Sequence, residues 1–154
     1  MTYKTKLSLL FSFTILLLVS CDPLVTEFPG KQAAREYTAN SLTTPHNKDT
    51  LTVVTWNIRF GIGRAEWFGD SCGELVLFNT DEIQNGLELL AAKITAMDVD
   101  ILLLQEVDTD SKRSAYIDQV QWLLDNTAMN YGVYASMWEV QFVPSDGLGR
   151  VNTG

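Results

Sequence analysis

The chain has 154 residues, enough for a single domain. It carries 19 Asp and Glu residues against 11 Lys and Arg residues, a formal net charge of −8 at pH 7. Tight non-specific binding to nucleic acid depends on clustered basic residues, so this composition argues against it. A nuclease is not excluded, because a bound metal ion reverses the sign of the field locally.

The N-terminus is typical of an export signal. Two lysines precede a largely apolar run at 7–19, which is shorter than the roughly 20 residues that span a bilayer. Residues 18–21 read Leu-Val-Ser-Cys and resemble the bacterial lipobox; the alternative is an ordinary secretory signal. The resemblance implies that residues 1–20 are a signal peptide, that Cys21 is lipidated, and that the protein is a cell-envelope lipoprotein on the inner or outer membrane.

The segment behind the anchor predicts a flexible tether. Residues 21–50 are rich in Thr, Asn, Ser and Pro. The only histidine, His46, lies there, and we expect it to be exposed and inert. Apart from Cys21 the sequence holds one cysteine, Cys72. A small buried thiol and a disulfide to a cysteine outside this chain are both compatible with that residue.

From residue 51 onward the pattern predicts alternating strands and helices. Residues 51–56 are dense in β-branched and aromatic side chains, which predicts a strand. Asn79 or Thr80 offers a helix N-cap, and an apolar stripe predicts an amphipathic helix over 81–97. The stripe comprises Ile83, Leu87, Leu90, Ala91, Ile94 and Met97.

The second half continues the alternation. Four consecutive aliphatic residues at 101–104 predict a strand covered on both faces. A helix is expected at about 116–128, and residues 131–142 predict one more strand, bent near Trp138. The order of strand, helix, strand, helix and strand indicates an α/β layered fold.

Polar residues end the first two core strands. We expect strands 51–58 and 101–107 to be neighbours with helix 81–97 packed across them, so that Asn57 and Glu106 converge at one rim of the sheet. Their hard oxygen donors suit Mg²⁺, which keeps several waters and takes further ligands from a phosphate. The residues alone are also compatible with Asn57 capping a turn and Glu106 being a solvated strand end.

Two motifs carry a family resemblance. Residues 56–59 read W-N-I-R after a hydrophobic strand, and residues 100–107 read D-I-L-L-L-Q-E-V. This pair resembles the endonuclease/exonuclease/phosphatase superfamily, which includes DNase I, exonuclease III, sphingomyelinases and inositol-polyphosphate phosphatases. The likeness covers 51–154. It implies the N-terminal half of a DNase I-like four-layer α/β sandwich, truncated at its C-terminus, in a hydrolase of phosphodiesters or phosphomonoesters.

The resemblance assigns the metal ligands. It implies that Asn57 and Glu106 hold Mg²⁺, or Mn²⁺ in its place, and that Gln105 supports Glu106 from behind. Arg59 matches an N-x-R variant in which the Arg lies near the scissile strand, although a surface Arg needs no function there.

A third stretch extends the likeness. Residues 107–114 read V-D-T-D-S-K-R-S, and Asp118 and Gln119 continue the pattern. Arg113 in this stretch is expected to meet a phosphate or to form a salt bridge at the start of the next helix. The loop 62–78 is longer than is usual in the family, so it either shapes substrate access or is an inert insertion.

The resemblance leaves the full reaction open. It places the acid–base His and Asp residues on later strands, hence no catalytic residue within the chain and no expected activity for it alone. The substrate is a nucleic acid, a phospholipid, or a sugar or inositol phosphate, the lipid anchor gives a membrane contact, and no protein partner is implied. The alternatives are a non-catalytic envelope lipoprotein that uses this fold as a binding module, and chance similarity in an unrelated α/β domain.

Overall fold

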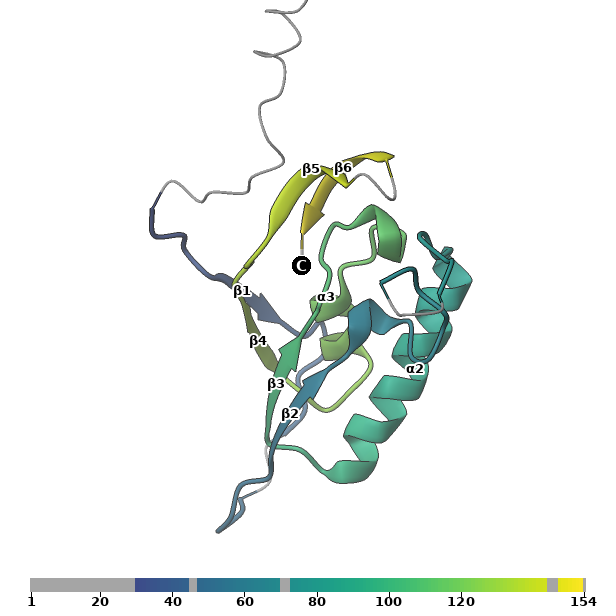
Figure 1. The fold of residues 1–154 in the computed structure, drawn as a ribbon. Helices are drawn as coiled ribbons and strands as arrows, with labels where there is room; N and C mark the ends of the chain where they lie inside the picture. The colour runs from purple at the N-terminus through teal and green to yellow at the C-terminus, as the bar shows by residue number, and fades with distance from the viewer. Residues whose placement is uncertain (1–29, 45–46, 70–72, 144–146, 154) are drawn as a thin grey trace, which may run out of the picture.

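The computed structural model describes residues 30–44, 47–69, 73–143 and 147–153 (Figure 1). Cys21, His46 and Cys72 lie outside these ranges, so the signal peptide, the lipidation and the state of the second thiol stay predictions. Within the described ranges, no helix combines the length and the apolar character needed to span a membrane.

The described chain combines helices with strands in small sheets, which confirms the α/β class. The strands form three two-stranded sheets, β1 with β4, β2 with β3, and β5 with β6. The elements are β1 (Arg35–Thr38), β2 (Val53–Asn57), η1 (Arg59–Gly61), α2 (Thr80–Met97), β3 (Ile101–Gln105), η2 (Lys112–Ser114), α3 (Gln119–Asp125), β4 (Tyr131–Tyr134), β5 (Glu139–Val143) and β6 (Gly147–Thr153).

The central unit is β2, α2 and β3. The two strands are parallel neighbours in a register that places Val53 opposite Ile101 and Asn57 opposite Gln105, and α2 runs alongside them (Figure 1). The predicted adjacency of these strands is therefore confirmed. Because both strands run the same way, their C-terminal ends meet at one rim of the sheet.

One face of this strand pair packs on the core and the other is largely exposed. Leu102 and Leu104 contact the buried cluster, whereas Ile101 is 42% and Leu103 53% exposed. The prediction that this strand is covered on both faces is wrong for the described structure. Side chains alternate between the faces of a strand, and α2 contributes its buried residues to one face only.

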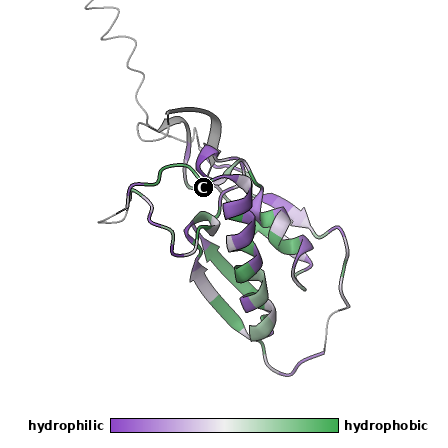
Figure 2. Cartoon of the chain, turned by 90° about the vertical axis from the view of Figure 1, so that its right-hand side faces the viewer, coloured by the Kyte–Doolittle hydropathy of each residue, from purple (hydrophilic) through white to green (hydrophobic). Residues whose placement is uncertain are grey.

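Helix α2 follows the predicted pattern closely. The Asn79 side chain accepts a hydrogen bond from Glu82 N, and the Glu82 carboxylate accepts one from Asn79 N, a complete capping box. Figure 2 shows both hydrophilic and hydrophobic residues along the helix, as amphipathicity requires. The predicted stripe is buried except for Met97, which is 39% exposed in the last turn.

The second predicted helix is shorter than expected. It spans Gln119–Asp125 rather than 116–128, with Asp118 as the N-cap. Ala115 and Tyr116 have φ values of 55° and 57°, so the chain cannot be α-helical at those positions. The interpretation of 116–118 as helix is therefore wrong.

The expected strand over 131–142 is two strands in different sheets. β4 pairs with β1 and β5 pairs antiparallel with β6, and the ladder is interrupted between Tyr134 and Glu139. The expected bend near Trp138 is therefore a complete break.

The tether prediction is wrong from Arg35 onward. Residues Arg35–Thr38 form β1, antiparallel to β4. Asn40 hydrogen-bonds Asp125 through both its backbone and its side-chain nitrogen, at 2.8 and 2.7 Å. Thr43 N donates to Asn130 Oδ1 at 2.7 Å. These partners lie more than 80 positions away in sequence, so local composition carried no sign of them.

Candidate functional site

Backbone hydrogen bonds join the two loops that leave β2 and β3. Ile58 N donates to Gln105 O at 3.0 Å, and Phe60 N donates to Glu106 O at 2.8 Å. The parallel pairing thus continues past the strand ends. We call residues 57–60 and 105–108 the rim loops.

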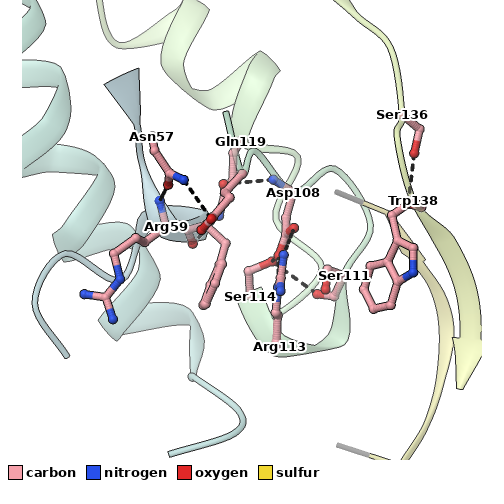
Figure 3. Close-up of polar contacts among 11 residues, drawn as sticks. Asn57, Arg59, Asp108, Ser111, Arg113, Ser114, Gln119, Ser136 and Trp138 are labelled. Atoms are coloured by element: carbon pink, nitrogen blue, oxygen red, sulfur yellow. Dashed lines mark hydrogen bonds and ion pairs between the residues drawn. The ribbon is translucent and has the colours of Figure 1, made fainter. Parts of the chain in front are cut away.

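The Asn57 and Glu106 side chains meet at this rim. Asn57 Nδ2 donates to Glu106 Oε1 at 2.7 Å (Figure 3), and both residues are exposed. Asn57 Oδ1 accepts a hydrogen bond from Arg59 N at 2.9 Å, so the side chain also caps the turn that follows β2. The turn-capping role and the convergence with Glu106 therefore coexist.

The oxygens of this pair suit a hard divalent cation. Asn57 Oδ1 has a second lone pair beyond the one that faces Arg59 N, and the Glu106 carboxylate has further acceptor sites. Within the described ranges, no three His, Cys, Asp or Glu side chains cluster closely enough to hold a metal ion. Two protein oxygens fit Mg²⁺, which commonly binds through one or two protein ligands, with waters and phosphate oxygens supplying the rest.

The rim loops hold unusual backbone conformations. Glu106, Arg59 and Phe60 have φ values of 55°, 47° and 41°, in the left-handed region that non-glycine residues rarely adopt. Such conformations cost on the order of 1–3 kcal/mol each and persist only where surrounding contacts enforce them. Their position at the candidate ligands indicates that the loop shape is imposed by the rest of the fold.

The Gln105 side chain does not support Glu106 as expected. Its amide nitrogen donates to Thr55 Oγ1 at 3.1 Å and to Leu103 O at 3.2 Å. An amide NH₂ has two protons and a carboxylate can only accept, so no donor is left for Glu106. Gln105 contributes through its backbone carbonyl, which accepts from Ile58 N.

The Arg59 side chain fastens the start of the long loop. Its guanidinium donates to Gly63 O at 2.6 Å and to Ala65 O at 3.3 Å. Figure 3 shows it extending away from Asn57. Trp67, further along the loop, packs edge-on against Phe60 with ring centroids 5.0 Å apart. The described part of loop 62–78 is thus attached to the rim.

Arg113 forms an ion pair with Asp108 at the rim, in place of the expected salt bridge at the start of the next helix. Its Nε and Nη2 each donate to the Asp108 carboxylate at 2.9 Å (Figure 3). Asp108 is fully buried, and the guanidinium also lies over the Phe60 ring, 3.9 Å from its centroid. The ion pair holds the turn after β3 and does not stand at the helix start. These bonds engage two of the five donors of Arg113.

Sequence reasoning missed the other members of this cluster. Ser114 Oγ donates to Asp108 Oδ2 at 2.8 Å, Gln119 Oε1 accepts from Asp108 N at 3.1 Å, and Gln119 Nε2 donates to Phe60 O at 2.7 Å. The sequence feature that could have identified them is the V-D-x-x-x-x-R-S stretch followed by Gln119. In the sequence analysis this stretch serves only as part of the family resemblance. We call Asp108, Arg113, Ser114 and Gln119 the rim network.

A hollow of about 580 Å³ opens beside the rim. Its polar lining includes Asn57, Gln105, Glu106 and Arg113, and most of the remaining lining is apolar. The Glu106 carboxylate and the Arg113 guanidinium therefore line a space large enough for a small organic group. Its apolar lining comes mainly from β3, α3, β4 and the segment after β4, including Leu102, Leu104, Val120, Leu124, Met137 and Trp138.

Comparisons with known proteins returned no matching family model, curated protein or solved structure. Function is therefore inferred from the residues and their geometry.

Proposed function

We propose that this chain carries the metal-binding rim of a Mg²⁺- or Mn²⁺-dependent phosphoesterase of the endonuclease/exonuclease/phosphatase type, whose fold is a DNase I-like sandwich. The observation that supports this most directly is the 2.7 Å contact between Asn57 and Glu106 at the ends of adjacent parallel strands. The two motifs that carry the resemblance lie 49 residues apart in sequence and meet at one point in space.

The proposed division of labour follows from the side chains at the rim. A divalent cation held by these residues would neutralise charge at a phosphate oxygen and lower the pKa of a coordinated water. Glu106 offers a carboxylate ligand, and Asn57 offers an amide oxygen whose direction is set by Arg59 N. Arg113 lines the adjoining hollow with Nη1 outside the Asp108 ion pair, and we propose that it binds a phosphate there.

We further propose that the protein acts at the cell envelope, anchored through Cys21. Its acidic composition favours a phospholipid or a sugar or inositol phosphate over a nucleic acid. Labelling with a fatty-acid analogue should tag the full chain, and Cys21→Ala should abolish the tag. Labelling that survives the substitution would remove the lipoprotein part of the proposal.

Metal binding is the direct test of the proposed site. We expect the full chain to bind Mn²⁺ in a calorimetric titration, and Glu106→Gln to weaken that binding at least tenfold. Glu88→Gln, which makes the same charge change on the exposed surface of α2, is the matched control and should bind as the wild type does. Equal Mn²⁺ affinity in Glu106→Gln and the wild type would contradict the proposal.

A non-catalytic binding module is the second candidate. It is favoured by the predominantly apolar hollow and by the lack of a larger acidic cluster in the described ranges. The same titration separates the two candidates, because a binding module has no need of a divalent cation at Glu106.

A further inference from the structure

One buried side chain connects the two rim loops. Gln119, at the start of α3, has no exposed surface. Its Nε2 donates to Phe60 O in the loop after β2, and its Oε1 accepts from Asp108 N in the loop after β3, at 2.7 and 3.1 Å. Figure 3 shows Gln119 between the Asn57 side and the Asp108 side of the rim.

Both ends of this bridge lie next to the candidate ligands. Phe60 is three residues after Asn57, and its own N–H donates to Glu106 O at 2.8 Å. Asp108 is two residues after Glu106. The backbone around Phe60 is thus held by Glu106 on one side and by Gln119 on the other. Phe60 and Glu106, which the first of these hydrogen bonds joins, both have the left-handed conformations described above.

The Asp108 end of the bridge is itself fixed. Arg113 and Ser114 together donate three hydrogen bonds to its carboxylate. The Arg113 guanidinium also covers the Phe60 ring, so it touches both loops that Gln119 joins. A Cβ at Gly61, whose φ is 80°, would lie 3.2 Å from Gln119 Nε2, which shows how closely the backbone approaches this side chain.

We propose that Gln119 is a positioning residue for the metal site. It holds the Asn57-bearing loop and the Glu106-bearing loop at the separation that lets their side chains meet, without itself touching the ion. The effect on metal binding rests on the function proposed above. The effect on loop geometry does not, because it follows from hydrogen bonds within the chain.

The test compares Gln119→Met with Tyr37→Phe in the full chain. Met fills a similar volume and removes both hydrogen bonds of Gln119. Tyr37→Phe removes the hydrogen bond that Tyr37 donates to Asp118, the N-cap of α3, and the one that it accepts from Arg35, and it leaves the rim contacts in place. Amide hydrogen exchange at Ile58 and Phe60, measured relative to the middle of α2, reports the loop geometry.

We expect exchange at Ile58 and Phe60 to become at least tenfold faster in Gln119→Met and to stay unchanged in Tyr37→Phe, relative to α2. Mn²⁺ affinity should fall at least tenfold in Gln119→Met and remain that of the wild type in Tyr37→Phe. A general loss of stability would raise exchange throughout the core and would not single out the rim. If Gln119→Met fails to fold, Gln119→Asn, which is one methylene shorter and cannot span both partners, takes its place.

Unchanged protection of Ile58 and Phe60 in the folded variant would overturn the inference. So would wild-type Mn²⁺ affinity in Gln119→Met when Glu106→Gln binds the ion more weakly. If Glu106→Gln also binds Mn²⁺ normally, the proposed metal site is what fails, and the exchange data decide the positioning role separately.

Discussion

The Arg113 guanidinium donates two parallel hydrogen bonds of 2.9 Å to the buried Asp108 carboxylate. The two residues lie five positions apart and enclose the turn that follows Glu106. Planar two-point contacts of this kind fix orientation as well as distance. The Arg113 guanidinium therefore contacts both Asp108 in the loop after β3 and the Phe60 ring in the loop after β2.

Removing Arg113 should be strongly destabilising. Arg113→Met leaves a carboxylate with no exposed surface and without its cation, which typically costs about 3–5 kcal/mol. Arg35→Met is the control, because its contact with Asp118 is 3.8 Å long and its side chain is 55% exposed, so its loss should cost about 1 kcal/mol or less. Urea unfolding measures both. Equal costs would show that the Asp108 ion pair does not stabilise the rim.

Gly86 should not tolerate a side chain, although it lies in the middle of α2. A Cβ at this position would collide with the backbone carbonyl of Gly61. Gly to Ala usually stabilises a helix interior by about 1 kcal/mol. We expect Gly86→Ala to lower the free energy of unfolding instead, whereas Gln84→Ala on the exposed side of α2 should leave it nearly unchanged. A gain in stability for Gly86→Ala would mean that α2 and η1 are not in close contact.

Asp100 should make the fold sensitive to acid. The Thr52 backbone N–H, 2.8 Å from the carboxylate, and then Lys48 hold the pKa of Asp100 below its ordinary value of 3.8. Between the lower folded-state pKa of Asp100 and its unfolded-state pKa, the unfolded chain binds more protons than the folded chain. The contribution of Asp100 to the free energy of unfolding is therefore complete above about pH 4 and is lost as pH falls through the folded-state pKa.

The matching measurement is urea unfolding of Asp100→Asn at several pH values. The variant should be less stable than the wild type near neutral pH. The difference between their free energies of unfolding should become smaller as pH falls below about 4. Asp49→Asn, an exposed substitution with the same charge change, serves as the control. A gap that stays constant with pH would show that the Asp100 carboxylate is not stabilised in the folded state.

The central unit was predictable because its signals are local. The apolar stripe and the Asn79 N-cap predict α2. The order strand, helix, strand along the chain predicts that the two strands are parallel neighbours. That pairing carries Asn57 and Glu106 to the same rim. Met97 belongs to the predicted apolar stripe but is not buried, because it lies in the last turn, where α2 extends beyond the core.

The remaining elements depend on contacts that sequence pattern does not express. β1 exists through pairing with β4, and the Asn40–Asp125 contact joins residues 85 positions apart. The left-handed residues Ala115 and Tyr116 shorten α3, although neither is a glycine that would signal it. In the sequence, Gln119 is only one residue of the motif that resembles the family. Its bridging role could not be predicted, because that role depends on how the two rim loops lie in space.

The most direct measurement of the central claim is paramagnetic broadening by Mn²⁺ in nuclear magnetic resonance spectra of the full chain. Substoichiometric Mn²⁺ should first broaden the side-chain amide of Asn57 and the backbone amides of 57–60 and 105–107, and Glu106→Gln should remove this effect. Preferential broadening elsewhere, for instance around Asp98 and Asp100, or an unaltered response in Glu106→Gln, would contradict a metal site at the Asn57–Glu106 rim.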